Sequence, residues 1–265
     1  MISSMFSLAV TVMLLASWNT YSDREGRPKQ QRVGTIVFTV SEWDAQQGHD
    51  DHEMRLHTNL WRINSDGTDS RPLTHLESYG CNSNNAAWSP DGKHIAFNSN
   101  CISQDVPPNT NPGKIITWSN VWIMNEDGSN PMPLMKSDKP TMNLGSAWSP
   151  DSRKIAFMSG HPQGNKPYIE SSDIWVVNAD GSGAVQLTNA GRSTHCMDGG
   201  AVWSPDGSKL AFTSNRALDG SITPNLNEAS NVWVVNADGS GLKPVTKFTE
   251  RNERDTVACS RLVCG

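Results

Sequence analysis

Short stretches in which apolar and polar residues alternate recur along the chain, and most are bounded by Gly, Pro, Asn, Asp or Ser. This pattern predicts short β-strands joined by turns. Strands of a first kind end at Trp88, Trp148 and Trp203, after small residues that suit a crowded innermost strand. Strands of a second and a third kind follow, at Lys93–Ser99, Lys154–Ser159, Lys209–Ser214 and at Val121–Asn125, Ile174–Asn178, Val232–Asn236. A fourth strand then leads away, as in Ala184–Thr188.

Two repeated phrases supply the turns between these strands. The phrase Trp-x-x-Asn-x-Asp-Gly-Ser/Thr occurs four times, at Trp61–Thr68, Trp122–Ser129, Trp175–Ser182 and Trp233–Ser240. Its Asp-Gly pair predicts a two-residue hairpin turn with positive φ at both turn residues. The phrase Trp-Ser-Pro-Asp occurs three times, and Ser89–Gly92 predicts a tight turn with Pro second and Gly fourth.

Repeats of this length indicate stacked similar units, and four antiparallel strands per unit form the blade of a β-propeller. We therefore predict an all-β chain of about four four-stranded blades. The first unit shows no clear first strand, because Thr35–Val40 has the pattern of a second strand. The segment Val257–Val263 would supply the missing strand and close the ring; the alternative is a truncated six-blade propeller.

The connections predict two unlike faces of the propeller. The turns after first and third strands are short and uniform and fall on one face, which we call the turn face. The connections after second and fourth strands fall on the opposite face, which we call the loop face. Its long loops are Ser41–Asn59, Asn100–Asn120, Gly160–Asp173 and Asn215–Asn231. Variable loops on a rigid scaffold usually carry function, so we expect the ligand there.

Charge and the N-terminus narrow the setting. The net charge is −5, the pI is 5.8 and no basic stripe occurs, which argues against a nucleic-acid partner. The uncharged run Met5–Ala16 predicts a signal peptide within residues 1–20, before a propeller domain at 31–265, and a periplasmic or secreted protein. A buried N-terminal strand or a poorly started reading frame are the alternatives. Trp18 stands where a lipoprotein box needs Cys, so no membrane anchor is expected.

The five cysteines lie on or near the loop face, and in an exported protein some of them should be oxidised. Cys81 leads into the first strand of a unit and Cys101 leaves the second strand of the same unit. These ends are adjacent, so a Cys81–Cys101 disulfide is geometrically reasonable. The odd number leaves at least one thiol free or paired between chains.

The paired phrases resemble the PD40 (WD40-like) repeat of the TolB family. The likeness is close at Trp88–Lys93 with Ile95–Phe97 and at Trp203–Phe212, and Trp148–Asp151 matches with Ser152 in place of Gly. The resemblance spans roughly Gly34 to Thr246 and implies a periplasmic propeller that binds proteins of the cell-envelope Tol–Pal system. This chain has four units, where TolB-like propellers have six, and no separate N-terminal α/β domain. Similar repeats occur beside prolyl-oligopeptidase-type peptidases and in oligogalacturonate lyases that hold a metal through His.

Two functions from different classes follow. The first is a non-catalytic module that binds a cell-envelope or extracellular protein or glycan without a cofactor. Its contacts would flank the inner strand ends or lie in loops; the candidates are Asn84, Asn85, Trp118, Asn143 and Asp198. The alternative is a metal-dependent carbohydrate-active enzyme, with a divalent metal held by His49, His52 and His195. A solvated acidic loop is the simpler explanation of His49–Glu53.

Other chemistry is not indicated. The chain has no Gly-x-Ser-x-Gly nucleophile elbow, no P-loop and no dinucleotide-binding fingerprint. The Asn-x-Asp-Gly-Ser phrase lacks the regular acidic series of a calcium loop, so it predicts a turn. The Trp residues repeat at equivalent strand positions, which indicates packing between blades rather than a sugar-stacking platform.

Overall fold

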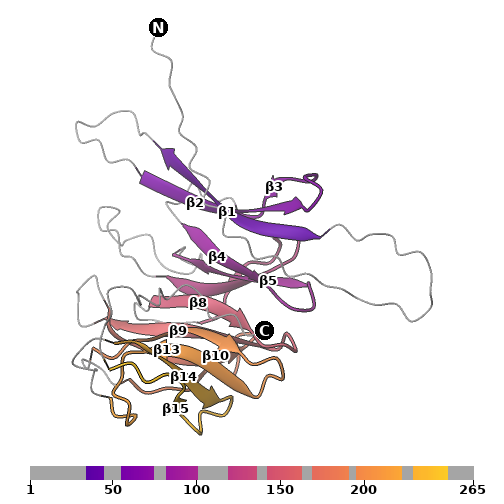
Figure 1. Ribbon diagram of the computed structural model, residues 1–265. Coiled ribbons are helices and arrows are strands. Elements are labelled where there is room, and N and C mark those ends of the chain that lie inside the picture. Colours follow the sequence, from indigo (N-terminus) through magenta and orange to yellow (C-terminus); the bar gives the residue numbers. More distant parts are fainter. Residues whose placement is uncertain are drawn as a thin grey trace, which may run out of the picture.

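The computed structural model describes residues 34–44, 55–74, 82–100, 119–135, 142–162, 169–190, 195–222 and 229–249. These residues form fifteen strands in four separate antiparallel sheets, which confirms the all-β fold (Figure 1). The described part of the chain contains no helix with the length and apolar character to cross a membrane. The predicted signal peptide, the closing strand Val257–Val263 and the Cys81–Cys101 disulfide lie outside the described residues and stay predictions.

The sheets follow one another along the chain, and we number them 1 to 4. Sheet 1 consists of β1 (Thr35–Asp44), β2 (Arg55–Asn64) and β3 (Arg71–Pro72). Sheet 2 consists of β4 (Ser83–Trp88), β5 (His94–Ser99), β6 (Asn120–Asn125) and β7 (Met132–Pro133). Sheet 3 consists of β8 (Met142–Trp148), β9 (Lys154–Pro162), β10 (Ile169–Asn178) and β11 (Val185–Gln186). Sheet 4 consists of β12 (Asp198–Trp203), β13 (Lys209–Ser214), β14 (Asn231–Asn236) and β15 (Lys243–Pro244).

Sheet 1 has three strands because its first strand is missing among the described residues. As predicted, β1 corresponds to a second strand: Phe38 pairs with Trp61 of β2, as Phe97 of β5 pairs with Trp122 of β6. The edge of β1 that faces away from β2 therefore has no partner strand in the described structure.

The two kinds of turn differ in how well the sequence predicts them. The Ser89–Gly92 turn is confirmed, since the Gly92 amide donates to the Ser89 carbonyl at 2.9 Å. The Asp-Gly turns depart from the prediction. Gly67 has φ +85°, but Asp66 is not among the residues with positive φ. The Gly67 amide donates to the Asn64 carbonyl and the Asn64 amide to the Thr68 carbonyl, which makes a three-residue loop with left-handed Gly at its end.

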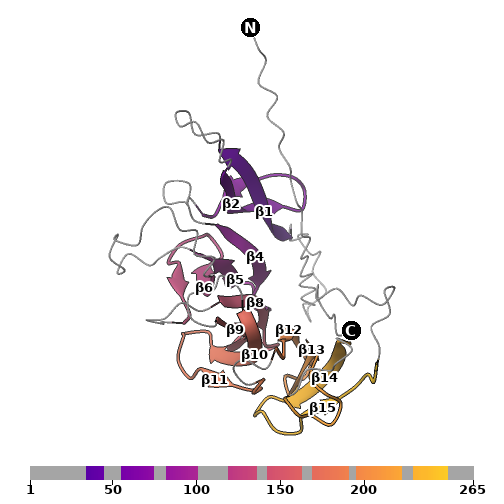
Figure 2. The same cartoon turned by 90° about the vertical axis from the view of Figure 1, so that its left-hand side faces the viewer.

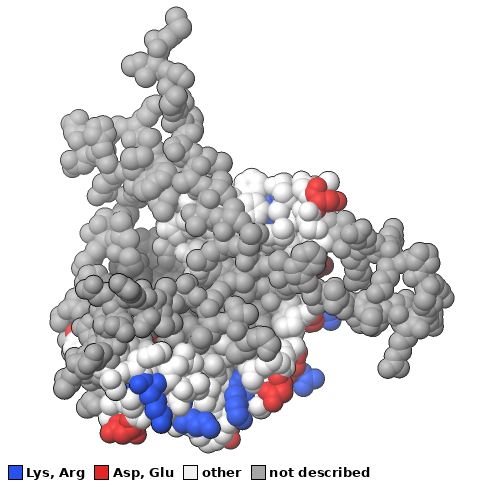
Figure 3. All heavy atoms as spheres, in the orientation of Figure 1, with Lys and Arg blue, Asp and Glu red and all other residues white. Residues whose placement is uncertain are grey.

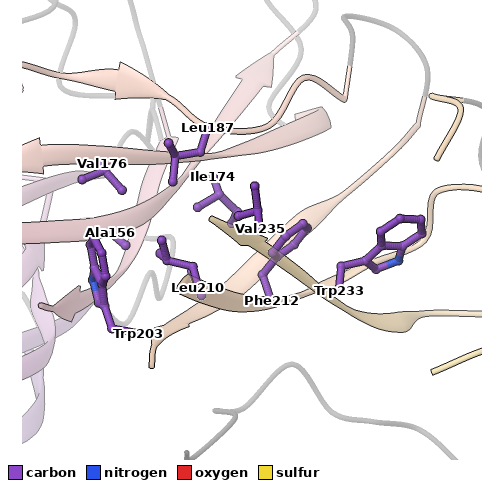
Figure 4. Packing of buried hydrophobic residues seen from close by; sticks show 10 residues of the cluster. Ala156, Ile174, Val176, Leu187, Trp203, Leu210, Phe212, Trp233 and Val235 are labelled. Carbon is purple, nitrogen blue, oxygen red and sulfur yellow. The ribbon is translucent and has the colours of Figure 1, made fainter. Parts of the chain in front are cut away.

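The sheets stack face on face in an arc, with sheets 1 and 4 at its two ends (Figures 1 and 2). We call the side of a sheet that faces the preceding sheet its leading face, and the side toward the next sheet its trailing face. Each of the three interfaces between successive sheets holds one apolar cluster. In the last, Leu210, Phe212 and Trp233 on the leading face of sheet 4 pack on Ile174 and Leu187 of sheet 3 (Figure 4). The side chains alternate along each strand, so one strand serves both of its neighbours.

Candidate binding face

The loop face is built from the polar ends of the strands. First strands begin there, second strands end there and third strands begin there. The first strands β4, β8 and β12 are neighbours of one another, so they line the inner side of the arc. Parallel bridges between Thr58 and Asn82, Ser119 and Met142, and Ser172 and Met197 join successive sheets at this face. The described strand ends of successive sheets are therefore joined to one another at the loop face.

A polar residue two positions before each third-strand Trp fixes the local backbone. At this position Asn231 accepts hydrogen bonds from Thr246 Oγ1 at 2.9 Å and from the Phe248 amide at 2.7 Å. Its amide nitrogen donates to the Phe248 carbonyl at 3.0 Å. Asn59 and Asn120 bond the end of their own unit in related ways. In the sequence, the signal for this role is an Asn repeated two positions before the third-strand Trp, and we did not predict the role from it.

A second polar position is repeated within this chain, five residues before each first-strand Trp. Ser83, Asn143 and Asp198 occupy it, and all three are at most 1% exposed. Two of them were predicted as ligand contacts. Ser83 was not predicted, although the same spacing to Trp88 marks it. Because all three are buried, they do not face the solvent, and Asn143 and Asp198 form hydrogen bonds with a neighbouring sheet.

Asn143 links sheets 2 and 3. Its side-chain nitrogen donates to Asn120 Oδ1 at 3.0 Å and its backbone amide to the Ser119 carbonyl at 2.8 Å. Its own carbonyl accepts from Asn98 Nδ2 at 3.0 Å. These hydrogen bonds join sheets 2 and 3 and keep Asn143, a predicted ligand contact, inside the protein.

Asp198 forms a buried ion pair with Arg216, which is 2% exposed and which the sequence did not single out. Burial raises the pKa of Asp198, against the opposing charge of Arg216 and hydrogen bonds from Ser214 and Thr188. The Arg216 guanidinium also lies 5.6 Å from the centre of the Trp233 ring, within cation–π range. Because a buried charge without its partner is costly, this pair fixes the loop-face end of sheet 4.

Asn84 and Asn85 occupy the inner strand β4 in different ways. Asn84 is exposed and pairs with Asn98, so its side chain is available to a ligand. Asn85 has φ +53°, and Gly145 and Gly200 hold the same place with φ +67° and +63°. All three lie where the register of the first strand shifts. Asn tolerates this conformation better than most residues, which explains Asn85 without a ligand.

The remaining predicted residues are only partly described. His195 is exposed with φ +58°, and its carbonyl accepts from Asn215 Nδ2 at 3.0 Å. His49, His52 and Trp118 lie outside the described residues. Within the described ranges, no three His, Cys, Asp or Glu side chains come together as metal ligands. The metal site stays a sequence-based prediction.

The turn face carries a regular series of aspartates. Every described turn of the two repeated phrases carries an Asp, and a neighbouring Ser or Thr donates to it in each case; these residues are Asp66, Asp91, Asp127, Asp151, Asp180, Asp206 and Asp238. Lys and Arg side chains lie beside Asp and Glu side chains at the lower end of the molecule in Figure 3, where Figure 1 places sheet 4. On the loop face, the exposed side chain of Asn84 offers a ligand hydrogen-bond donors and an acceptor.

The stacked four-stranded sheets and the repeated Trp phrases define the class: a TolB-like β-propeller repeat protein. No family model matches the chain. Over 133 residues it is 31% identical to the Tol-Pal system protein TolB of Anaeromyxobacter dehalogenans (strain 2CP-C). That match covers 49% of this chain and 24% of the relative, so the chain spans only a small part of TolB. An uncharacterised peptidase, YuxL of Bacillus subtilis (strain 168), is 25% identical over 126 residues, which are 48% of this chain and 16% of the peptidase.

Solved structures share the fold. A protein assigned as TolB from Agrobacterium tumefaciens has a TM-score of 0.50 at 21% identity, over 81% of this chain and 69% of that one. An oligogalacturonate lyase in complex with manganese has a TM-score of 0.51 at 16% identity, over 80% of this chain and 50% of that one. At these identities the likeness shows the propeller architecture alone.

Proposed function

We propose that this chain is an exported, non-catalytic binding module that recognises a protein of the cell envelope with its loop face. The observation that carries the proposal is the likeness to the Tol-Pal system protein TolB, at 31% identity over 133 residues. Export rests on the N-terminal pattern of residues 1–20, and the periplasm is the compartment it favours.

The physical argument for the loop face is its rigidity. Asn143 joins sheets 2 and 3 there, and the Asp198–Arg216 pair fixes the end of sheet 4, so the exposed groups beside them lose little freedom on binding. Asn84 is the exposed predicted contact in the described part, at the edge of the inner strand β4. An extended segment or loop of a partner would meet its amide and the neighbouring backbone.

The enzyme alternative depends on His49 and His52, which lie outside the described residues. A likeness at 16% identity to a manganese-bound lyase supports the shared fold and no ligand set. The alternative therefore stays a prediction from the sequence.

The test is a capture experiment followed by affinity measurement. Immobilised protein is exposed to envelope extract, and each captured protein is purified and titrated. We expect Asn84→Arg to weaken binding about tenfold or more, because a bulky charge replaces a neutral amide in the contact. Ser70→Arg is the matched control, since Ser70 is also exposed but follows a turn on the opposite face. The proposal fails if no envelope protein binds, or if both variants bind like the original chain.

A further inference from the structure

The outward face of sheet 4 carries apolar residues that nothing described covers. Val245 on this trailing face is 58% exposed. The residues that hold the same place after the earlier Trp phrases are Leu73, Leu134 and Leu187, and they are only 6%, 2% and 9% exposed. Inside the stack this position is covered by the next sheet, so sheet 4 presents a surface suited to a further sheet.

The strand residues of the same face agree. Val232 and Val234 of β14 are half-buried, whereas Ile174 and Val176, their counterparts in β10, are 0% and 5% exposed. Ala211 of β13 is also half-buried. Terminal repeats of a stacked protein normally end in a polar outer face, whereas this face carries half-buried apolar strand residues beside Lys243.

The outward face of sheet 1 is the complementary case. Ile36 and Phe38 of β1 are half-buried on its leading face. Ile95 and Phe97 hold these positions in sheet 2, where they pack against sheet 1 and are 0% and 2% exposed. Both ends of the stack therefore present the kind of surface that the interior interfaces bury.

A glycine contact shows how the two ends fit. A Cβ added at Gly128 would lie 2.9 Å from the Leu73 carbonyl oxygen, and one added at Gly181 would lie 3.0 Å from that of Leu134. Each Asp-Gly turn thus packs directly on the Leu of the preceding sheet. The turn of sheet 1 lacks this neighbour, since nothing lies within 4 Å of a Cβ added at Gly67. Gly67 of sheet 1 and Val245 of sheet 4 are therefore the two halves of such a contact, and each lacks its partner in the described structure.

Charges at the rim have the same complementarity. At the first interface Arg71 Nη1 donates to the Asp127 carbonyl at 3.5 Å. The Ser129 hydroxyl lowers the pKa of Asp127, and the charge of Arg71 lowers it further. Lys243 holds the place of Arg71 on sheet 4, and Asp66 holds the place of Asp127 on sheet 1.

We propose that two copies of this chain associate head to tail, with the trailing face of sheet 4 in one copy packed on the leading face of sheet 1 in the other. Val245 would meet Gly67, which repeats a contact formed three times within the chain. Lys243 would meet Asp66, which repeats the Arg71–Asp127 contact of the first interface. Unlike surfaces make this a heterologous interface, which closes into a ring or extends into a chain of copies. This association goes beyond the binding function of the loop face.

The experiment is sedimentation or light scattering of the purified chain over a range of concentrations. The unchanged chain should form dimers or larger species. Val245→Lys should raise the dissociation constant at least about tenfold, because the interface would bury a charge without a partner. Val185→Lys is the matched control, since Val185 is 53% exposed on β11 and lies on neither end face. It should leave the association unchanged.

Mixing separates head-to-tail pairing from other arrangements. Ile36→Lys on the leading face should also give a monomer, with its fold checked by circular dichroism. Asp66→Lys, at an exposed turn, replaces it if that variant does not fold. An equimolar mixture with Val245→Lys should restore one-to-one dimers, because each variant keeps one intact face. A chain that stays monomeric at all concentrations, an equal loss with Val185→Lys, or a mixture that stays monomeric would each overturn the proposal.

Discussion

At the residue scale, the turn aspartates show how a short hydroxyl side chain fixes a loop. Ser204 Oγ donates to Asp206 Oδ1 at 2.6 Å, and the Ser208 amide donates to the same oxygen at 2.9 Å. The Ser204 hydrogen bond is the main reason that the pKa of Asp206 falls to about 2. The charged carboxylate is therefore favoured in the folded state.

We expect Asp206→Asn to reduce the stability of the protein at neutral pH. The folded pKa of about 2 lies below the ordinary value of 3.8, so Asp206 stabilises the fold above pH 3.8. This contribution is lost as the pH falls through the folded value. The difference in free energy of unfolding between the variant and the original chain, measured by urea titration at several pH values, should therefore disappear near pH 2. A difference that is independent of pH would contradict this account.

Ser152 illustrates a residue whose role the pattern concealed. It stands where the other Trp-Ser-Pro-Asp turns have Gly, and it has φ +61°. Its hydroxyl accepts the Asp91 amide at 3.0 Å, which links sheets 2 and 3. This contact offsets the strain of the left-handed conformation, but the sequence shows only a missing Gly.

At the element scale, the hydrogen bonds of the first-strand Trp residues reflect the lack of a first strand in the described part of sheet 1. Trp148 Nε1 donates to the Ala87 carbonyl at 3.0 Å, and Trp203 Nε1 donates to the Ala147 carbonyl at 3.1 Å. Each acceptor belongs to the first strand of the preceding sheet. Trp88 Nε1 is buried without a hydrogen-bond partner, since sheet 1 has no first strand in the described structure.

We expect Trp203→Phe to cost more stability than Trp88→Phe, by about 1 kcal/mol, because only the first change removes a formed hydrogen bond. The comparison is made on the free energy of unfolding in urea. Equal losses would mean that the Trp88 indole has an acceptor in solution, as it would if a further strand paired with β1.

The sequence predicts the strands closely, but it does not show which candidate contact residues are buried, and the elements show why. Strand periodicity and turn chemistry are local, so the sequence predicts strand bounds well. The predicted strand Lys209–Ser214 coincides with β13, and the predicted strand Val232–Asn236 lacks only Asn231, the first residue of β14. The two-residue Asp-Gly hairpin was wrong because loop length depends on how the flanking strands pair. Asn143 was predicted as a ligand contact, but the adjoining sheet buries it.

At the scale of the whole molecule, the stack has two covered sheets and two end sheets. Sheets 2 and 3 contribute to apolar clusters on both faces, and sheets 1 and 4 on one. In such a stack, each unit is stabilised mainly by its neighbours, so the ends should open first.

We expect hydrogen exchange to be slower in β5 and β9 than in β13. All three strands pair with a strand on each side, so they differ chiefly in whether the trailing face of their sheet is covered. Mass spectrometry of the monomeric Val245→Lys variant measures this, and the unchanged chain at high concentration is the comparison. Equal exchange in the three strands would indicate that the stack opens as one cooperative unit.

The sequence by itself determined the strands, most of the turns and the repeated four-stranded unit, because these depend on spacings within a few residues. The tertiary structure decided which polar residues are available. It buried Asn143 and paired Asp198 with Arg216, and it left Asn84 exposed. It also showed that Val245 lacks the cover its counterparts have. Burial depends on the neighbouring sheet, and no local pattern within one unit contains that information.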